Sequence, residues 1–193
     1  MPNWCSTTYK IVGKHEEVTA IHELLNTLKA KNTKPSSFVG INLWDVVESL
    51  GGDLETISCR GNILSYKLSE DENVLRIDQQ TAWGECADFR HFLEKVYPHV
   101  KIYYQEEEPM EDIFYTNDHT GKYFPEKYFL DTEDTEYEPE YFNSIEDTMK
   151  RIEEITGTRI KTEDDMNETL DLYLEKHGDD VWYSLHKFEV VDD

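Results

Sequence analysis

Polar and apolar residues alternate near the start of the chain and then change to helical spacing. Thr7 to Val12 alternates in this way and ends at Gly13, which predicts a β-strand. Over residues 15–31 the apolar side chains recur three and four positions apart, which predicts an amphipathic helix. The chain therefore opens with a strand followed by a helix.

The same patterns continue as far as residue 106. Residues 63–68 and 74–79 predict two strands joined by a polar turn, residues 87–97 a second helix, and residues 100–106 a further strand. The order strand, helix, strand, strand, helix, strand is that of a ferredoxin-like split βαβ arrangement. We therefore expect an α+β fold with an antiparallel sheet and both helices on one of its faces. Residues 32–61 form an insertion with a short helix over 43–50.

An additional hairpin and a carboxy-terminal extension are predicted after this core. Residues 113–117 and 122–130 have the pattern of a hairpin, and 131–140 form an acidic connector. Two helices follow, because Ser144 with Asp147, and Thr162 with Asp165, match the start signal of a helix.

The two predicted tail helices end at Gly157 and Gly178, and an aromatic strand over 181–191 closes the chain. We expect residues 1–130 to form the ferredoxin-like domain and residues 131–193 to pack on it.

Four short motifs resemble those of one protein family, and they occur in the family's order. They are Met1-Pro2-Asn3-Trp4-Cys5, Thr81-Ala82-Trp83, Tyr97-Pro98 and Glu107-Glu108-Pro109. Over residues 1–130 the chain resembles the YubB-like ferredoxin-like domain family of phages, plasmids and gut bacteria. The segment Met110 to Tyr115 departs from that family's Gly-rich stretch. The resemblance implies a fold and a mobile-element or gut-bacterial origin, and no catalytic residues, because the family has no settled activity.

Acidic residues dominate the composition. The 193 residues include 42 acidic and 19 basic side chains, for a formal net charge of -23. This balance argues against direct binding of nucleic acid or anionic membranes and would attract a basic protein partner. No apolar run approaches the about 18 residues of a membrane span. The lack of a signal-peptide pattern and the three scattered cysteines indicate a cytoplasmic protein with reduced thiols.

The predicted strands divide their side chains between two faces of the sheet. The inward set is Tyr9, Ile11, Leu64, Tyr66, Leu75, Ile77, Ile102 and Tyr104. The opposite face collects a candidate contact surface of Trp4, Lys10, Lys67, Arg76, Lys101 and Tyr103. Three interpretations stay open: a base-stacking surface for RNA, a face covered by the acidic tail helices, or an ordinary exposed face.

A second candidate surface is acidic and follows the fourth strand of the predicted core. It consists of Glu106, Glu107, Glu108, Glu111 and Asp112. With the connector, this run could bind a basic partner or mimic the phosphates of a nucleic acid, and a solvated charged face is the alternative.

No catalytic, metal or cofactor site is predicted. His22-Glu23 begins like a zinc-protease motif, but Asn26 stands where the second ligand is required. Cys5 falls on the inward side of the first strand and is expected to be buried and inert. Cys86 precedes the second helix, whose dipole could instead lower the pKa of the thiol.

The sequence therefore predicts a non-enzymatic acidic interaction protein. The alternatives are a small-molecule or peptide-binding module, or an enzyme with a pocket between the sheet and the insertion that uses Trp44 and Trp83.

Overall fold

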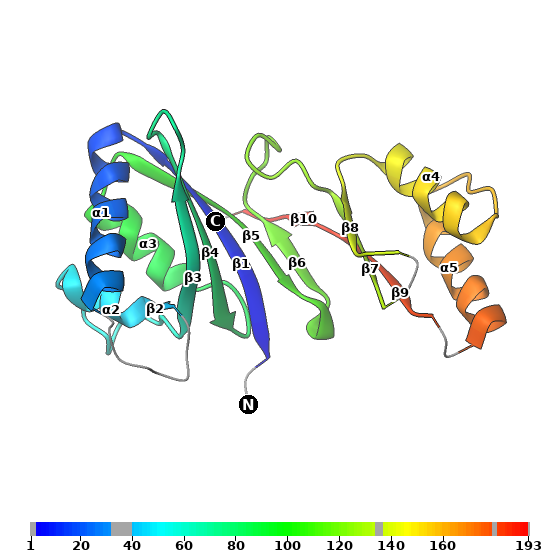
Figure 1. Ribbon diagram of the computed structural model, residues 1–193, viewed down its shortest axis with the longest axis horizontal. Coiled ribbons are helices and arrows are strands. Elements are labelled where there is room, and N and C mark those ends of the chain that lie inside the picture. The colour runs from blue at the N-terminus through cyan, green and yellow to red at the C-terminus, as the bar shows by residue number, and fades with distance from the viewer. Residues whose placement is uncertain (1–2, 32–39, 134–136, 179–180, 193) are drawn as a thin grey trace. The chain divides into compact units, whose positions relative to one another are not determined.

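The chain divides into two compact units (Figure 1). The computed structural model describes residues 3–31, 40–133, 137–178 and 181–192. The first unit comprises residues 1–118 with 192–193, and the second comprises 119–191. Met1 and Pro2 of the opening motif, part of the insertion and part of the acidic connector lie outside the described residues.

The first unit is built on an antiparallel sheet. Its strands are β1 (Trp4–Gly13), β2 (Ile41–Asn42), β3 (Gly61–Leu68), β4 (Val74–Ala82), β5 (Val100–Glu108) and β6 (Ile113–Thr116). Within this unit they follow the order β6-β5-β1-β4-β3-β2. The α+β class is confirmed, and the sheet is wider than the predicted one because β2 and β6 extend its two edges.

The described residues of this unit include three helices and a short 3-10 turn, η1 (Pro109–Glu111). The helices are α1 (His15–Lys31), α2 (Leu43–Ser49) and α3 (Ala87–Val96). Helices α1 and α3 lie on one face of the sheet (Figure 1), where their apolar residues meet those of the strands. The bounds of α1 agree with the helix predicted from apolar spacing.

Side chains predicted to face the helices are buried on β1, β4 and β5 but not on all of β3. Leu64 is 46% exposed, and Ile63 takes the buried position in its place. The reason is a register shift between Ile63 and Ser65 in the pairing of β3 with β4, which inserts one extra residue. The predicted inward position of Leu64 is therefore wrong.

The predicted hairpin over 113–130 is also wrong. Strand β6 pairs with β5 in the first unit, whereas β7 (Tyr128–Thr132) belongs to a second sheet. The second unit consequently begins at His119, whereas the sequence analysis ended the ferredoxin-like domain at residue 130.

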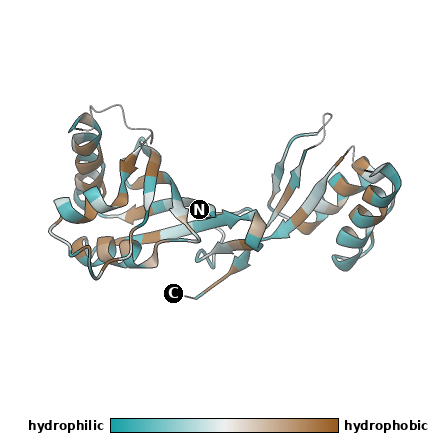
Figure 2. Cartoon of the chain, turned by 90° about the horizontal axis from the view of Figure 1, so that it is seen from below, coloured by the Kyte–Doolittle hydropathy of each residue, from teal (hydrophilic) through white to brown (hydrophobic). Residues whose placement is uncertain are grey.

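The second unit packs two helices on a three-stranded antiparallel sheet of order β8-β7-β9. Its remaining elements are β8 (Glu140–Phe142), α4 (Ile145–Thr156), α5 (Asp164–His177), β9 (Tyr183–Lys187) and β10 (Glu189–Val190). The core lies between strands and helices and includes Tyr128, Leu130, Ile152, Met166, Leu170 and Tyr183. Both helices show hydrophobic and hydrophilic bands in Figure 2, as expected of amphipathic helices.

The predicted signals at the ends of the tail helices are confirmed. The Ser144 hydroxyl accepts a hydrogen bond from the Asp147 backbone N–H at 3.1 Å, and Gly157 ends α4 with φ of 66°. Thr162 and Asp165 exchange side-chain to backbone hydrogen bonds of 3.0 and 3.3 Å. Ser144 therefore caps α4, whereas the Thr162–Asp165 pair holds the start of α5, whose N-cap residue Glu163 makes no side-chain capping bond.

Candidate functional site

The sheet register brings most of the predicted contact surface together. Lys67 lies opposite Arg76, Arg76 opposite Lys10, and Lys10 opposite Tyr103, so the four side chains form one row across β3, β4, β1 and β5. Residues directly opposite one another are about 5 Å apart, where like charges are destabilising. Asp78 offsets part of this repulsion, because its Oδ1 lies 2.7 Å from the Arg76 Nε.

Lys101 and Trp4 lie away from this row. Lys101 is two residue pairs away from Tyr103 along β5, opposite Val12. Trp4 stands six residues before Lys10, about 20 Å along β1. Trp4 is therefore not part of the cluster of bases, although it has the same parity on the strand. Helices α4 and α5 bury their apolar sides against their own sheet, and the covered-face interpretation stays a prediction.

The acidic run after Gln105 is divided by the structure. Glu106 and Glu108 are buried, at 6% and 2% exposure, because they continue the helix-facing side of β5. The Glu108 carboxylate accepts a hydrogen bond from the Glu111 N–H at 2.6 Å and thereby caps η1. Glu111 and Asp112 are exposed, so an acidic surface at this position stays a prediction for the exposed members of the run.

Glu106 instead belongs to a buried polar cluster beneath the loop that precedes α3. Its Oε2 accepts the Glu85 backbone N–H at 2.6 Å and lies 3.5 Å from the Cys5 Sγ. The Glu85 side chain accepts hydrogen bonds from the Tyr9 hydroxyl and, at 3.1 Å, from the Arg90 Nε. We call Tyr9, Glu85, Arg90 and Glu106 the buried cluster.

Burial controls the protonation of this cluster. It raises the pKa of Glu85 and of Glu106, although the Arg90 guanidinium acts in the opposite direction on both. It also raises the pKa of Tyr9 well above its ordinary value, and the charge of Glu85 adds to the shift. Two carboxyl groups share one buried guanidinium, so the cluster favours holding a proton.

The two thiols next to this cluster are not activated. Burial raises the pKa of Cys5 and of Cys86 to about 12 in each case. The prediction for Cys5 is consistent with this, and at Cys86 burial outweighs the lowering of the pKa that the helix dipole could cause. Both side chains are therefore protonated and weakly nucleophilic at neutral pH.

The loop above the buried cluster is strained and carries an exposed aromatic ring. Trp83 has a φ of 75°, which is uncommon for a residue with a Cβ, and its N–H donates to the Asn3 carbonyl at 2.9 Å. Its side chain is 55% exposed. The hydrogen bonds of Glu85 hold this loop against β1 and β5, so the cluster fixes the position of Trp83.

An open groove of about 550 Å³ lies between the end of the insertion and α3. Gly51, Gly52 and Ile57 line one side, and Phe92 and Lys95 of α3 line the other. Trp44 and Trp83 do not line this groove, and neither do the two carboxyl groups of the buried cluster. This groove lies between the insertion and α3. It is therefore not the pocket between the sheet and the insertion that the enzyme alternative requires.

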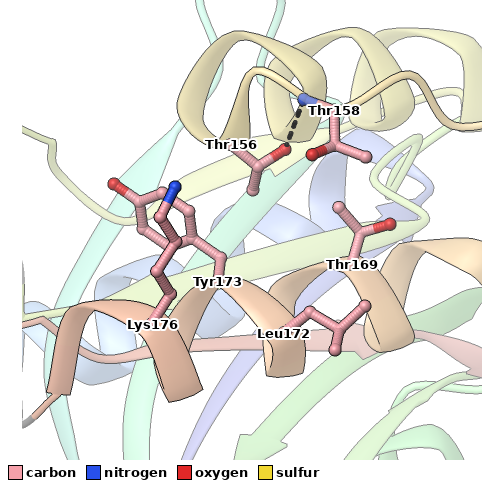
Figure 3. A pocket seen from close by; sticks show the side chains of 6 residues that line it. All are labelled: Thr156, Thr158, Thr169, Leu172, Tyr173 and Lys176. Atoms are coloured by element: carbon pink, nitrogen blue, oxygen red, sulfur yellow. Dashed lines mark hydrogen bonds between the residues drawn. The ribbon is translucent and has the colours of Figure 1, made fainter.

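A smaller hollow of about 200 Å³ lies in the second unit between the end of α4 and α5 (Figure 3). Thr156 and Thr158 line it from the α4 side, and Leu172, Tyr173 and Lys176 line it from α5. This volume is below the about 300–1,000 Å³ of pockets that enclose small ligands. The hollow is instead a shallow depression in the surface beside α5.

That surface carries a row of carboxylates, which we call the acidic row. Asp164, Glu168, Asp171 and Glu175 are exposed and spaced four, three and four residues apart, so they lie on one side of α5. None of the four makes an ion pair or side-chain hydrogen bond with the residues that the structure describes. Like charges at such spacing destabilise a helix by about 0.2–0.5 kcal/mol per pair.

Sequence reasoning missed both the buried cluster and the acidic row as units. Glu106 has the same parity on β5 as the inward Ile102 and Tyr104, and this signal could have placed its carboxylate inside the protein. The spacing of the acidic row is likewise visible in the sequence. That its members form no ion pair with the described residues depends on neighbours that only the structure places.

The described residues contain neither a cluster of metal ligands nor a helix able to span a membrane. The described residues include no group of three or more His, Cys, Asp or Glu side chains placed to hold a metal ion. Among the helices of the described ranges, none has the length and apolar character needed to cross a bilayer. Comparisons with models of known families, with curated proteins and with solved structures find no match for this chain.

Proposed function

We propose that the protein is a non-enzymatic acidic interaction protein that binds a basic protein partner through α5. The observation that carries this proposal is the acidic row. Four exposed carboxylates extend over about 16 Å of one helix, and they find no counter-charge among the described residues.

An apolar contact is available beside the acidic row. Leu172 is 59% exposed between Asp171 and Glu175 and also lines the small hollow of Figure 3. Protein interfaces combine an apolar core with a polar rim, whereas a solvated charged face needs no apolar core. Leu172 with the acidic row therefore supports a protein partner.

The composition of the second unit supports the same proposal. Residues 119–191 contain 20 acidic and 8 basic side chains. Such a field increases the rate at which a basic partner associates, and salt weakens the effect.

The finer fold and the origin of the chain are part of the proposal. The order β5-β1-β4-β3, with α1 and α3 on one face, supports a ferredoxin-like core that β2 and β6 extend. The family resemblance over residues 1–130 supports a mobile-element or gut-bacterial origin, and the free cysteines support a cytoplasmic protein.

Binding of a fluorescent lysine- and arginine-rich peptide tests the proposed function. The test variant is E168Q/D171N/E175Q, and the matched control is E23Q/E48Q/E70Q, which removes three exposed acidic charges from the first unit. We expect the affinity of the test variant to fall by a factor between about 3 and 150, since each of the three exposed pairs contributes about 0.2–1 kcal/mol. Equal weakening of both variants would show that the peptide senses only net charge and would contradict the proposal.

A further inference from the structure

The groove of the first unit has the size of a ligand site and lies on a different surface from α5. Its volume of about 550 Å³ is within the about 300–1,000 Å³ of small-molecule pockets. It is formed by residues of the insertion and of α3, all within the first unit. Neither the acidic row nor the basic residues Lys10, Lys67 and Arg76 of the sheet line it.

Opposite charges stand at the two ends of the groove. Asp88 lies in the first turn of α3 and Lys95 in the last turn. Seven residues separate them, so they lie on the same side of the helix and about 10 Å apart along its axis. Along α3 the groove therefore changes from a carboxylate to an ammonium group with His91 between them, and Asp53 adds a second carboxylate from the insertion.

Both end groups have hydrogen-bonding capacity to spare. The Asp88 Oδ2 accepts the Ser58 N–H at 3.2 Å, and its Oδ1 accepts no hydrogen bond from any described residue. Lys95 makes no ion pair or side-chain hydrogen bond within the described part of the chain. A carboxylate can accept at both oxygens, and an ammonium group donates three hydrogen bonds.

Apolar side chains line the groove between and beside these charges. Phe92 stands one turn after Asp88, and Ile57 faces α3 from the insertion. Gly52 allows this close approach, because a Cβ there would lie 2.8 Å from the Phe92 Cζ and 2.5 Å from the Val47 Cγ1. Along α3 the groove therefore presents a carboxylate that can bind a cation, then an apolar surface, and then an ammonium group that can bind an anion.

We propose that this groove binds a short zwitterionic peptide that lies extended along α3, with its amino group at Asp88 and its carboxylate at Lys95. Three extended residues span at most about 10–11 Å, which matches the spacing of Asp88 and Lys95 along the axis of α3. The apolar side chains of the peptide contact Phe92 and Ile57. This binding is independent of the basic partner proposed for α5.

NMR titration of the ¹⁵N-labelled full chain with trileucine tests the inference. The matched probes are N-acetyl-trileucine, which lacks the cation, and trileucine amide, which lacks the anion. We expect trileucine to shift the amides of Gly51, Gly52 and Lys95, and each blocked probe to bind about tenfold more weakly. Absence of trileucine binding, equal affinity for all three probes, or shifts confined to other surfaces would overturn the inference.

Variants at the two ends assign the orientation. Lys95→Gln should abolish the preference for trileucine over its amide and keep the preference over the acetylated form. Asp88→Asn should do the reverse, and Lys14→Gln, an exposed lysine outside the groove, should change neither. Lys95→Gln removes no described contact, so its folding is not at risk, and an unchanged preference in this variant would overturn the assigned orientation.

Discussion

At the scale of single residues, the buried cluster is the feature with the largest energetic consequence. Arg90 and Glu85 form an ion pair whose side chains are only 3% and 5% exposed. Removing one partner of a buried pair leaves an uncompensated charge, whereas an exposed pair contributes little. Arg90 therefore stabilises the first unit by compensating the buried Glu85 carboxylate, a role that the amphipathic pattern of α3 does not indicate.

Replacing Arg90 should strongly destabilise the first unit. We expect Arg90→Met to lower the free energy of unfolding by about 3–5 kcal/mol, as measured by denaturant titration. The control is Arg76→Met, because Arg76 pairs with Asp78 at the surface and should cost about 0.2–1 kcal/mol. Similar losses in the two variants would contradict the claim that Arg90 compensates a buried carboxylate at Glu85.

The raised pKa of Glu106 should appear as a pH dependence of stability. Because its pKa in the folded protein lies above the ordinary 4.5, its contribution is full below that value and is lost as pH rises through the folded pKa. The unfolding free energy of the wild type should therefore fall more steeply above pH 4.5 than that of Glu106→Gln. Parallel curves for the two proteins would show that Glu106 is not perturbed.

At the scale of elements, local signals predicted helices better than they predicted strand partners. The bounds of α1 follow from one apolar stripe, and α4 follows from Ser144 and Gly157. By contrast, the register shift at Ile63 and the pairing of β6 with β5 depend on residues distant in sequence. Alternation records which side chains share a face, but it does not identify the neighbouring strand.

The cap of α4 offers a test of one such local signal. Ser144→Ala should lower the stability of the second unit by about 1 kcal/mol, because the Asp147 N–H loses its acceptor. Ser144→Asn preserves a capping side chain and should remain close to the wild type. Thermal unfolding followed by circular dichroism measures both, and an unchanged midpoint in Ser144→Ala would contradict the contribution of the cap.

At the scale of the whole molecule, two separate cores indicate two cooperative units. Ile77 is buried in the first unit and Ile152 in the second, and packing of the tail on the first unit stays a prediction. The candidate surfaces follow the same division, with the groove in the first unit and the acidic row in the second.

Core mutations should separate the two units. Ile77→Ala and Ile152→Ala should each lower the free energy of one unfolding transition by about 2–5 kcal/mol and leave the other unchanged. Differential scanning calorimetry of the full chain measures both transitions. A single transition that both variants shift equally would contradict the division.

Binding of a basic partner by the acidic row is the central claim. Its most direct test is an NMR titration of the ¹⁵N-labelled full chain with the lysine- and arginine-rich peptide at low and high salt. The largest shifts should fall on amides of Asp164 to Glu175 and disappear at high salt, because exposed charges are then screened. Shifts spread evenly over the acidic residues, or concentrated in the first unit, would contradict the claim.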